Sequence, residues 1–176
     1  MYNLNMENFK EIKLDEIAKY KDPFSLFSSR ALAASSSKKG SNALTIGWGG
    51  IGTLFSLPCC TIYINKKRYS KIIFDEADYF SVCFFNDEYN EVLDKFYGTL
   101  SGKDVDKMNN GPLKVIDIDG VPAFKEAELI IICKMMAKSD FDVDKIYIPR
   151  IESWYRKDGV HTIYHGQIIK VYRKDK

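Results

Sequence analysis

The sequence predicts a mainly β fold, a β-barrel with peripheral helices. Segments that mix β-branched and aromatic residues, or that alternate apolar and polar ones, outnumber segments with helical periodicity. The regular alternation of strand and helix that marks a doubly wound parallel sheet is not found in the pattern. A chain of 176 residues has the length of one domain with one sizeable core, so we expect residues 1–176 to form a single domain.

Each element of the N-terminal half is expected from its local pattern. In chain order these elements are a helix at 8–20, a core strand at 30–34, a polar loop at 35–41, strands at 42–47 and 59–64, and a helix at 71–77. The first helix ends at Asp22-Pro23, because the residue before a proline disfavours helical backbone. Ser70 can cap the helix that follows it. The polar loop is either a flexible linker or a source of hydroxyls and amines for a polar ligand.

The C-terminal half continues with more strands than helices. In order we expect a strand at 79–85, a helix at 89–97, a loop at 101–107 that enters a short helix ending at 110–111, strands at 115–117 and 121–124, a strand at 128–136, a helix at 149–157 and a strand at 161–172. Apolar residues from Tyr89 to Tyr97 recur at helical spacing, and Gly98 can end that helix. Asp119-Gly120 provides the turn of a hairpin.

Composition argues against several classes of protein. The 26 basic and 24 acidic side chains give a formal charge of +2, so we expect neither a nucleic-acid partner nor a membrane partner. The four cysteines, at 59, 60, 83 and 133, lie in apolar surroundings and are interpreted as buried thiols in a reducing compartment. Acidic residues near the N-terminus argue against a signal peptide. We therefore expect a cytoplasmic protein.

The stretch from Asn42 to Thr53 is the first candidate site. It contains four glycines within six positions, so we expect a turn in which the backbone can take positive φ values and approach a ligand closely. Gly47 to Gly52 also satisfies the G-x-G-x-x-G pattern of dinucleotide-binding folds. That fingerprint needs a helix directly after the glycines, whereas residues 53–58 lead into another strand. A Rossmann fold is therefore rejected.

A cationic segment follows the next expected strand. Lys66, Lys67 and Arg68 stand beside Tyr69 and Ser70, a combination of cations and hydroxyls that can hold a phosphate. The alternative interpretation is a solvated turn. His161 and His165 share one face of the last strand, but no Asp, Glu or Cys accompanies them at ligand spacing, so a metal site is not expected.

These segments resemble a known family. Asn42 to Gly49, followed by Arg68-Tyr69-Ser70, is similar to the flavin reductase-like, FMN-binding split-barrel family, with flavoredoxin and related NAD(P)H:FMN oxidoreductase-like proteins as the nearest branch. Further segments fall in the order that the family shows, at 78–85, 101–107, 122–129 and 164–168. No single motif decides the resemblance, but their joint order is highly specific and covers nearly the whole chain.

The resemblance implies a six-stranded Greek-key split barrel that forms a homodimer, with FMN near the subunit interface. The residues that it implies along the flavin ring and ribityl chain are Asn42, Ala43, Leu44, Thr45, Ile46, Gly47, Trp48 and Gly49. Arg68, Tyr69 and Ser70 would hold the phosphate. Ser101, Gly102 and Lys103 match a loop near the flavin, where a cation could stabilise the charge of the reduced ring.

Three positions depart from the family pattern. Asn65-Lys66-Lys67 stands where the family often has Arg-Pro-Ser, so one bidentate phosphate ligand is missing, and either Lys66 or Lys67 could replace it as a point charge. Lys103 stands where an arginine is common. Leu44 replaces a usual methionine.

The resemblance implies a flavin-dependent oxidoreductase in which NADH or NADPH delivers hydride to bound FMN, so no protein acid or base is required. One alternative is a flavoredoxin-like electron carrier that a partner protein reduces, without direct use of NAD(P)H. A second is a split-barrel binding module that has lost FMN, which the missing arginine motivates. The sequence leaves the choice between NADH and NADPH and the final electron acceptor open.

Overall fold

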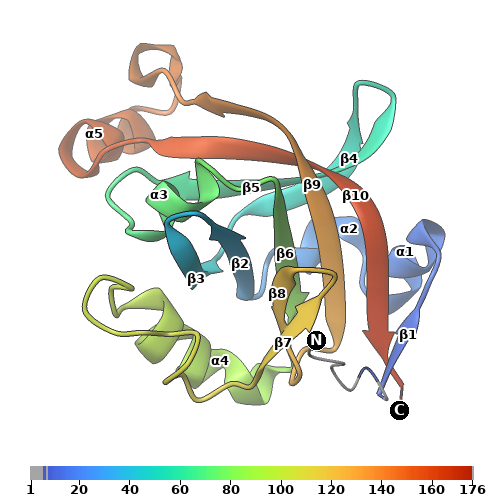
Figure 1. The fold of residues 1–176 in the computed structure, drawn as a ribbon. Helices are drawn as coiled ribbons and strands as arrows, with labels where there is room; N and C mark the ends of the chain where they lie inside the picture. The colour runs from blue at the N-terminus through green and yellow to red at the C-terminus, as the bar shows by residue number, and fades with distance from the viewer. Residues whose placement is uncertain (1–5, 7, 176) are drawn as a thin grey trace.

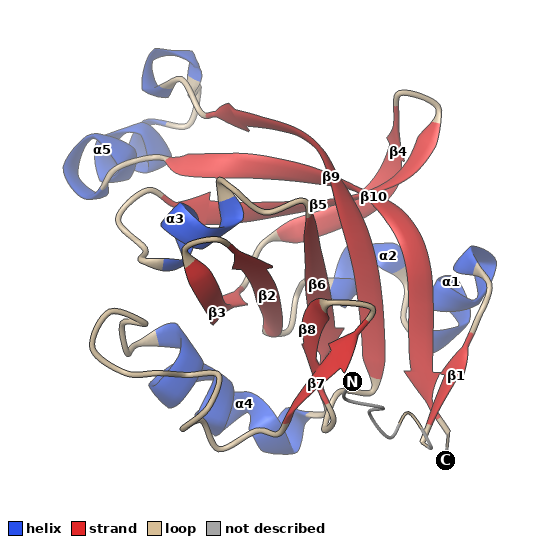
Figure 2. Ribbon diagram, in the orientation of Figure 1, coloured by secondary structure: helices blue, strands red, loops and turns tan. Residues whose placement is uncertain are grey.

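The computed structural model describes residue 6 and residues 8–175. Its main feature is one large, strongly curved antiparallel sheet with helices at its periphery (Figures 1 and 2). The strands of this sheet are β1 (Phe9–Glu11), β2 (Ala31–Ser37), β3 (Gly40–Ile46), β4 (Gly49–Leu54), β5 (Leu57–Asn65), β6 (Tyr79–Phe84), β9 (Leu129–Asp140) and β10 (His161–Lys174). The mainly β class with peripheral helices is confirmed.

The strands of the sheet follow the order β3-β2-β6-β9-β10-β5-β4, and β1 pairs with β10. The sheet has eight strands, where the resemblance implied a six-stranded barrel. β3 and β4 are neighbours in sequence but lie at opposite ends of this path, and in the described part of the chain no strand pair closes it. A separate hairpin, β7 (Val115–Ile118) and β8 (Val121–Phe124), has its turn at Asp119-Gly120 as expected.

The helices are short. They are α1 (Ile17–Tyr20), α2 (Pro23–Leu26), α3 (Ser70–Phe74), α4 (Asn90–Val92) and α5 (Pro149–Asp158), with 3-10 turns at Leu14–Glu16, Asp87–Tyr89 and Val143–Lys145 and a π-helical turn at Leu93–Gly98. The segments from residue 87 to residue 98 are continuous, so the helix expected at 89–97 is confirmed. α5 lies beside the start of β10, far from both chain ends (Figure 1).

The central strands are buried on both faces. Along β9, Leu129, Ile131 and Cys133 belong to the core inside the curved sheet, whereas Ile130 and Ile132 belong to a second core on the other face. The helical segment 87–98 and the β7–β8 hairpin cover this second core. All four cysteines are buried and none forms a disulfide, as the sequence predicts.

β10 bends sharply along its length (Figure 2). Its pairing with β9 shifts register at His165/Gly166 and again at Ile168/Lys170. A Cβ atom on Gly166 would lie 2.5 Å from the Phe80 ring, so only glycine allows this close approach. The bulges and the glycine together allow β10 to bend, so that one long strand extends along both ends of the barrel.

Two expected elements of the N-terminal half are wrong. Residues 9–11 form β1, which pairs with the end of β10, so the helix expected at 8–20 reduces to the short turns at 14–20. The polar segment 35–41 is the tip of the β2–β3 hairpin, with Ser37 paired to Gly40. Pairing with a neighbouring strand supplies the backbone hydrogen bonds that decide the conformation of such serine-rich segments.

Further expectations fail for local reasons. The glycine-rich segment is strand β4 rather than a turn, and its glycines do not adopt positive φ; the turn after it uses Phe55 and Ser56 instead. Ser70 makes no capping bond to α3. Residues 101–110 contain turns in place of the expected short helix. β10 extends to Lys174, two residues beyond the strand expected at 161–172.

Candidate functional site

Three segments that are distant in sequence meet around one small cavity. They are the start of β3, the turn between β5 and α3, and the loop at 99–107. The cavity has a volume of about 90 Å³, and its lining includes Leu44, Arg68, Ser70 and Ser101. A larger hollow of about 420 Å³ adjoins it and shares Tyr69, Gly102 and Lys107. That second volume lies within the roughly 300–1,000 Å³ range of small-molecule sites.

A polar junction holds the three segments together. Asn42 is buried, with 2% exposure, and its side-chain amide donates a hydrogen bond of 2.8 Å to Ser70 Oγ. A Cβ atom on Gly102 would lie only 2.5 Å from the Asn42 amide, so glycine is what allows the 99–107 loop to approach β3. Asn42, Ser70 and Gly102 therefore set the shape of the cavity wall.

Arg68 and Lys107, two of the three cations that line this cavity, have no acidic partner among the described residues. Lys107 is 2% exposed, and its Nζ donates a hydrogen bond of 2.8 Å to the Tyr97 carbonyl oxygen. Arg68 is exposed on the β5–α3 turn. Within residues 6 and 8–175, neither side chain forms an ion pair with a carboxylate. A buried ammonium is costly unless an opposite charge neutralises it, so this arrangement favours an anion.

The pKa of Lys107 reflects this unneutralised charge. Burial, together with the positive charge of Arg68, lowers the pKa of Lys107 from 10.5 to about 8. The ammonium form is therefore destabilised in the free protein and would be restored by a bound anion. Arg68 also contributes, after burial, to lowering the pKa of His161 to about 4. Arg68 lines the same cavity as Lys107, and a backbone bond from Lys66 to Val160 ties its turn to the chain just before β10.

The structure brings together eight of the fourteen residues that the sequence predicts for the site. Those that line the two cavities are Asn42, Leu44, Arg68, Tyr69, Ser70, Ser101, Gly102 and Lys103. The other six lie on the same segment of chain but outside these cavities. They are Ala43, Thr45, Ile46, Gly47, Trp48 and Gly49.

Most of these six have packing partners elsewhere. Ala43 and Ile46 lie in the two cores, and the Thr45 hydroxyl donates a hydrogen bond to the Leu93 carbonyl oxygen. Gly49 lies against the Phe27 ring. Trp48 is half-exposed and packs on Trp154 and His161.

Sequence reasoning missed Lys107 as a site residue. It lies within the segment 101–107 that carries the resemblance, but its burial and its bond to Tyr97 depend on how the loop folds. Lys66, one of the two lysines suggested as a replacement for the missing arginine, instead forms an ion pair of 2.7 Å with Asp140. Lys67 lines the small cavity, and its Nζ lies 3.4 Å from the Lys157 carbonyl oxygen.

Cavity size alone would select a different place. A hollow of about 910 Å³, larger than either of these, lies between the β2–β3 hairpin and the segment 108–117. Its lining includes Lys114 and Asp117, whereas no acidic residue among those described lines the small cavity around Arg68 and Lys107. Among the described residues, no group of three or more His, Cys, Asp or Glu side chains is arranged to hold a metal ion. None of the helices in this part of the chain has the length and apolar character needed to cross a bilayer.

The fold matches a known class of protein. A sequence model of the flavin reductase like domain matches residues 25–176. The match covers most of the chain, so the protein belongs to the flavin reductase-like family. A search of curated proteins finds no significant match.

Three solved structures illustrate the shared fold. Flavoredoxin from Methanosarcina acetivorans is 22% identical with a TM-score of 0.66, over 83% of this chain and 68% of that one. An FMN-binding domain of a flavin reductases-like enzyme from Shewanella baltica OS155 is 12% identical with a TM-score of 0.68, over 95% and 78%. An NADH:FAD oxidoreductase from Streptomyces globisporus C-1027 is 14% identical with a TM-score of 0.63, over 82% and 75%. At these identities the likeness shows the fold alone.

Proposed function

We propose that this protein binds FMN and that Arg68, Lys107 and Ser70 hold its phosphate. The observation that carries the proposal is the pair of cations at one cavity without a carboxylate partner in the described chain. A phosphate dianion would neutralise both, and Arg68 can bind it through two parallel hydrogen bonds. The departure from the family pattern at Asn65-Lys66-Lys67 is then compensated by Lys107, from a different segment.

The rest of the cofactor would extend from this anchor along the first part of the segment that the resemblance implies, Asn42 to Gly47, with Ser101 and Lys103 on the facing loop. When bound, the flavin supplies the redox chemistry: it takes up two electrons and a proton as hydride from NADH or NADPH and passes the electrons to an acceptor. The protein's task is to hold and orient the cofactor. Asn42 would act indirectly, because its amide fixes Ser70 and the Gly102 backbone.

A flavoredoxin-like electron carrier is the second candidate. Two flavoredoxins, from Methanosarcina acetivorans and from Desulfovibrio vulgaris, share the fold. In this function the flavin would be reduced by a partner protein and would not react with a nicotinamide nucleotide. As part of the same proposal, the family resemblance leads us to expect a homodimer in the cytoplasm. Light scattering on the purified protein tests whether it is a dimer.

The test is the visible absorption spectrum of the purified protein, followed by anaerobic addition of NADH and then NADPH. A flavin spectrum that bleaches at a catalytic rate supports the oxidoreductase. A flavin spectrum that survives both nucleotides supports the carrier. A protein that is colourless and stays so after incubation with FMN refutes flavin binding and favours a module that has lost its cofactor.

A further inference from the structure

Four rings gather at the end of the sheet beside the candidate site. We call Trp48, Trp154, Tyr155 and His161 the aromatic cluster. The Trp48 ring lies 4.9 Å from the His161 ring and 5.8 Å from the Trp154 ring, measured between centroids. The Tyr155 ring stacks on the Trp154 ring at 4.9 Å. The cluster thus joins the link between β3 and β4, the start of β10, and α5.

The cluster has a buried base and an open surface. Tyr155 is 5% exposed, whereas Trp48 is 48% exposed and Trp154 is 37% exposed. Tyr155 also packs on Phe141, which stacks on Tyr63 of β5, so the base is attached to the sheet. Two indole rings that are held in place and yet half-open to solvent form a surface on which a planar ring can stack.

Cations border this surface. Backbone and side-chain bonds tie the β5–α3 turn to the start of β10, since Lys66 N donates to the Val160 carbonyl oxygen and Asn65 Nδ2 to the Gly159 carbonyl oxygen. Arg68 and Lys67 are therefore adjacent to the cluster. Arg150 precedes Trp154 by four residues in α5 and so lies on the same helix face.

In the described part of the chain these cations have no carboxylate partners. Within the described ranges, none of Lys67, Arg68 and Arg150 forms an ion pair with an acidic side chain. Arg156, on the same helix, is by contrast bonded to Asp144 and Glu152. The surface is therefore complementary to a ligand that combines a planar ring with negative charge.

His161 adds a polar group with an unmet bond. Its Nδ1 atom is buried and has no hydrogen-bond partner among the residues that the structure describes. The lowered pKa, caused by burial and by the charge of Arg68, keeps the ring neutral at physiological pH. A neutral imidazole between two indoles extends the stacking surface and does not repel the cations beside it.

We propose that the aromatic cluster binds an aromatic ring of the nicotinamide dinucleotide, while Lys67 and Arg150 face its phosphates. This inference rests on the proposed function, because it assigns a docking surface to the electron donor beside the flavin site. Arg68 lines the same cavity as Lys107, and the turn that carries it is bonded to the chain just before His161. A dinucleotide with its ring on the cluster would thus approach the flavin site from the side of α5.

The sequence contains two tryptophans, and both are in the cluster, so tryptophan fluorescence reports on this surface alone. Flavin-free protein would be titrated with NADH and with NADPH, with ribose 5-phosphate as a ligand that lacks a ring. We expect saturable quenching by at least one dinucleotide and none by ribose 5-phosphate. Because the titration contains no FMN, the dissociation constant of the dinucleotide does not depend on whether the protein binds flavin.

Substitutions of Trp154 test whether the dinucleotide binds at the aromatic cluster. Trp154→Ala should weaken dinucleotide binding roughly 10-fold or more and leave the FMN dissociation constant unchanged, whereas Trp154→Phe, which keeps a ring, should restore most of the affinity. Phe24→Ala is the matched control, because Phe24 is 96% exposed on α2, away from α5 (Figure 1).

Two results would overturn the proposal. One is the absence of saturable quenching by both dinucleotides in folded wild-type protein. The other is a loss of FMN affinity in Trp154→Ala with dinucleotide binding unchanged, which would assign the cluster to the flavin ring instead. Failure of the proposed function gives a third result, distinct from these two: the wild-type protein does not bind FMN at all.

Discussion

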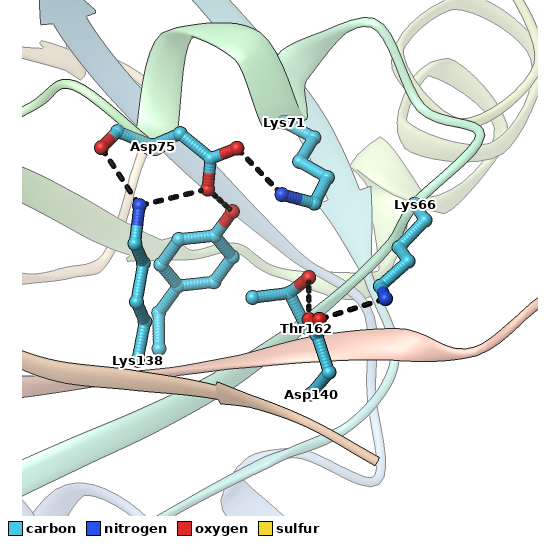
Figure 3. Close-up of polar contacts among 7 residues, drawn as sticks. Lys66, Lys71, Asp75, Lys138, Asp140 and Thr162 are labelled. Carbon is cyan, nitrogen blue, oxygen red and sulfur yellow. Dashed lines mark hydrogen bonds and ion pairs between the residues drawn. The ribbon is translucent and has the colours of Figure 1, made fainter. Parts of the chain in front are cut away.

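The cations on the two sides of the β5–α3 turn differ in whether they pair with a carboxylate. On one side, Lys66, Lys71 and Lys138 all reach a carboxylate, either Asp75 or Asp140 (Figure 3). On the other side, Arg68 and Lys107 line a cavity without such a partner in the described residues. The cations at 66, 68 and 71 stand within six positions of each other, so their different surroundings come from the fold and not from local composition.

The ion-pair side is a closed network. Asp75 accepts bonds from Lys71 Nζ at 2.5 Å, from Lys138 Nζ at 3.3 Å and from the buried Tyr164 hydroxyl at 2.8 Å (Figure 3). Burial alone would raise the pKa of Asp75, but these three bonds outweigh it and hold the pKa below its usual value. Asp140 similarly accepts bonds from Lys66 and from Thr162.

The comparison separates charges that stabilise the fold from charges that remain available to a ligand. Every strong donor around Asp75 and Asp140 already has an acceptor, so an anion would have to displace a carboxylate there. Lys107 has only a carbonyl oxygen, and Arg68 has no acidic partner in the part of the chain described. The neutralised side should therefore matter for stability and the other side for binding.

The largest expected effect is on FMN affinity. Arg68→Ala should weaken FMN binding by about 1.5–3 kcal/mol, because it removes charged hydrogen bonds to the phosphate. Riboflavin, which lacks the phosphate, should bind equally to both proteins. Titration by flavin fluorescence measures both constants. Arg156→Ala is the control, since Arg156 is an exposed arginine already paired with Asp144 and Glu152. An equal loss of FMN affinity in this control would contradict the assignment of Arg68 to the phosphate.

The next effect concerns stability on the ion-pair side. Asp75→Ala should lower the free energy of unfolding by about 2 kcal/mol, because it leaves the Tyr164 hydroxyl buried without its acceptor. FMN affinity should not change. Urea denaturation checks the first statement and flavin titration the second. A variant that keeps full stability but loses FMN would reverse the roles of the two sides.

A pH dependence of binding follows from Lys107. The pKa of this group is about 8 in the free protein, and a bound phosphate favours the ammonium form and so raises that pKa in the complex. FMN affinity should therefore hold below pH 8 and fall at higher pH, by at most about tenfold per pH unit.

Asp106 and Tyr97, which lie near Lys107, do not titrate in this window. The pKa of Asp106, lowered mainly by its bonds from Asn109, keeps that carboxylate ionised. The pKa of Tyr97 is raised by burial to about 12. Lys107→Met should abolish the fall in affinity at high pH. A fall that persists in this variant would assign it to another group.

The smallest effect is expected at Lys66. Its pair with Asp140 is about half-exposed, so Lys66→Ala should cost no more than about 1 kcal/mol of stability. FMN affinity should stay the same, measured by the same titration as for Arg68. A large loss of affinity would mean that Lys66 leaves Asp140 to bind the phosphate, as the sequence alone allowed.

The sequence predicted much of this fold because many of its signals are local. The periodicity from Tyr89 to Tyr97 and the Asp119-Gly120 turn depend on neighbouring residues, and the structure confirms both elements. β1 and the strand at Ser35–Ser37 were missed because each exists only through pairing with a distant strand. The glycine-rich segment was expected as a turn for the same reason, since its pairing with β5 overrides the freedom of its glycines.

The sequence predicts which residues form the candidate site but not which of the charged side chains around it are neutralised. The resemblance indicated Asn42, Ser70 and Gly102 separately, and the structure places both Ser70 and Gly102 against the Asn42 side chain. Whether a given lysine is free or neutralised depends on partners far away in sequence, such as Asp140 for Lys66. Lys107 could not be recognised without knowing that its ammonium is buried beside Arg68.

The most direct test compares FMN with riboflavin as ligands of the flavin-free wild-type protein. The two differ only in the phosphate, so the ratio of their dissociation constants isolates what Arg68 and Lys107 contribute. We predict that FMN binds roughly 100-fold or more tightly than riboflavin, and that the ratio collapses towards one when both cations are removed in Arg68→Ala with Lys107→Met. Equal affinity of the wild-type protein for the two flavins would contradict the account.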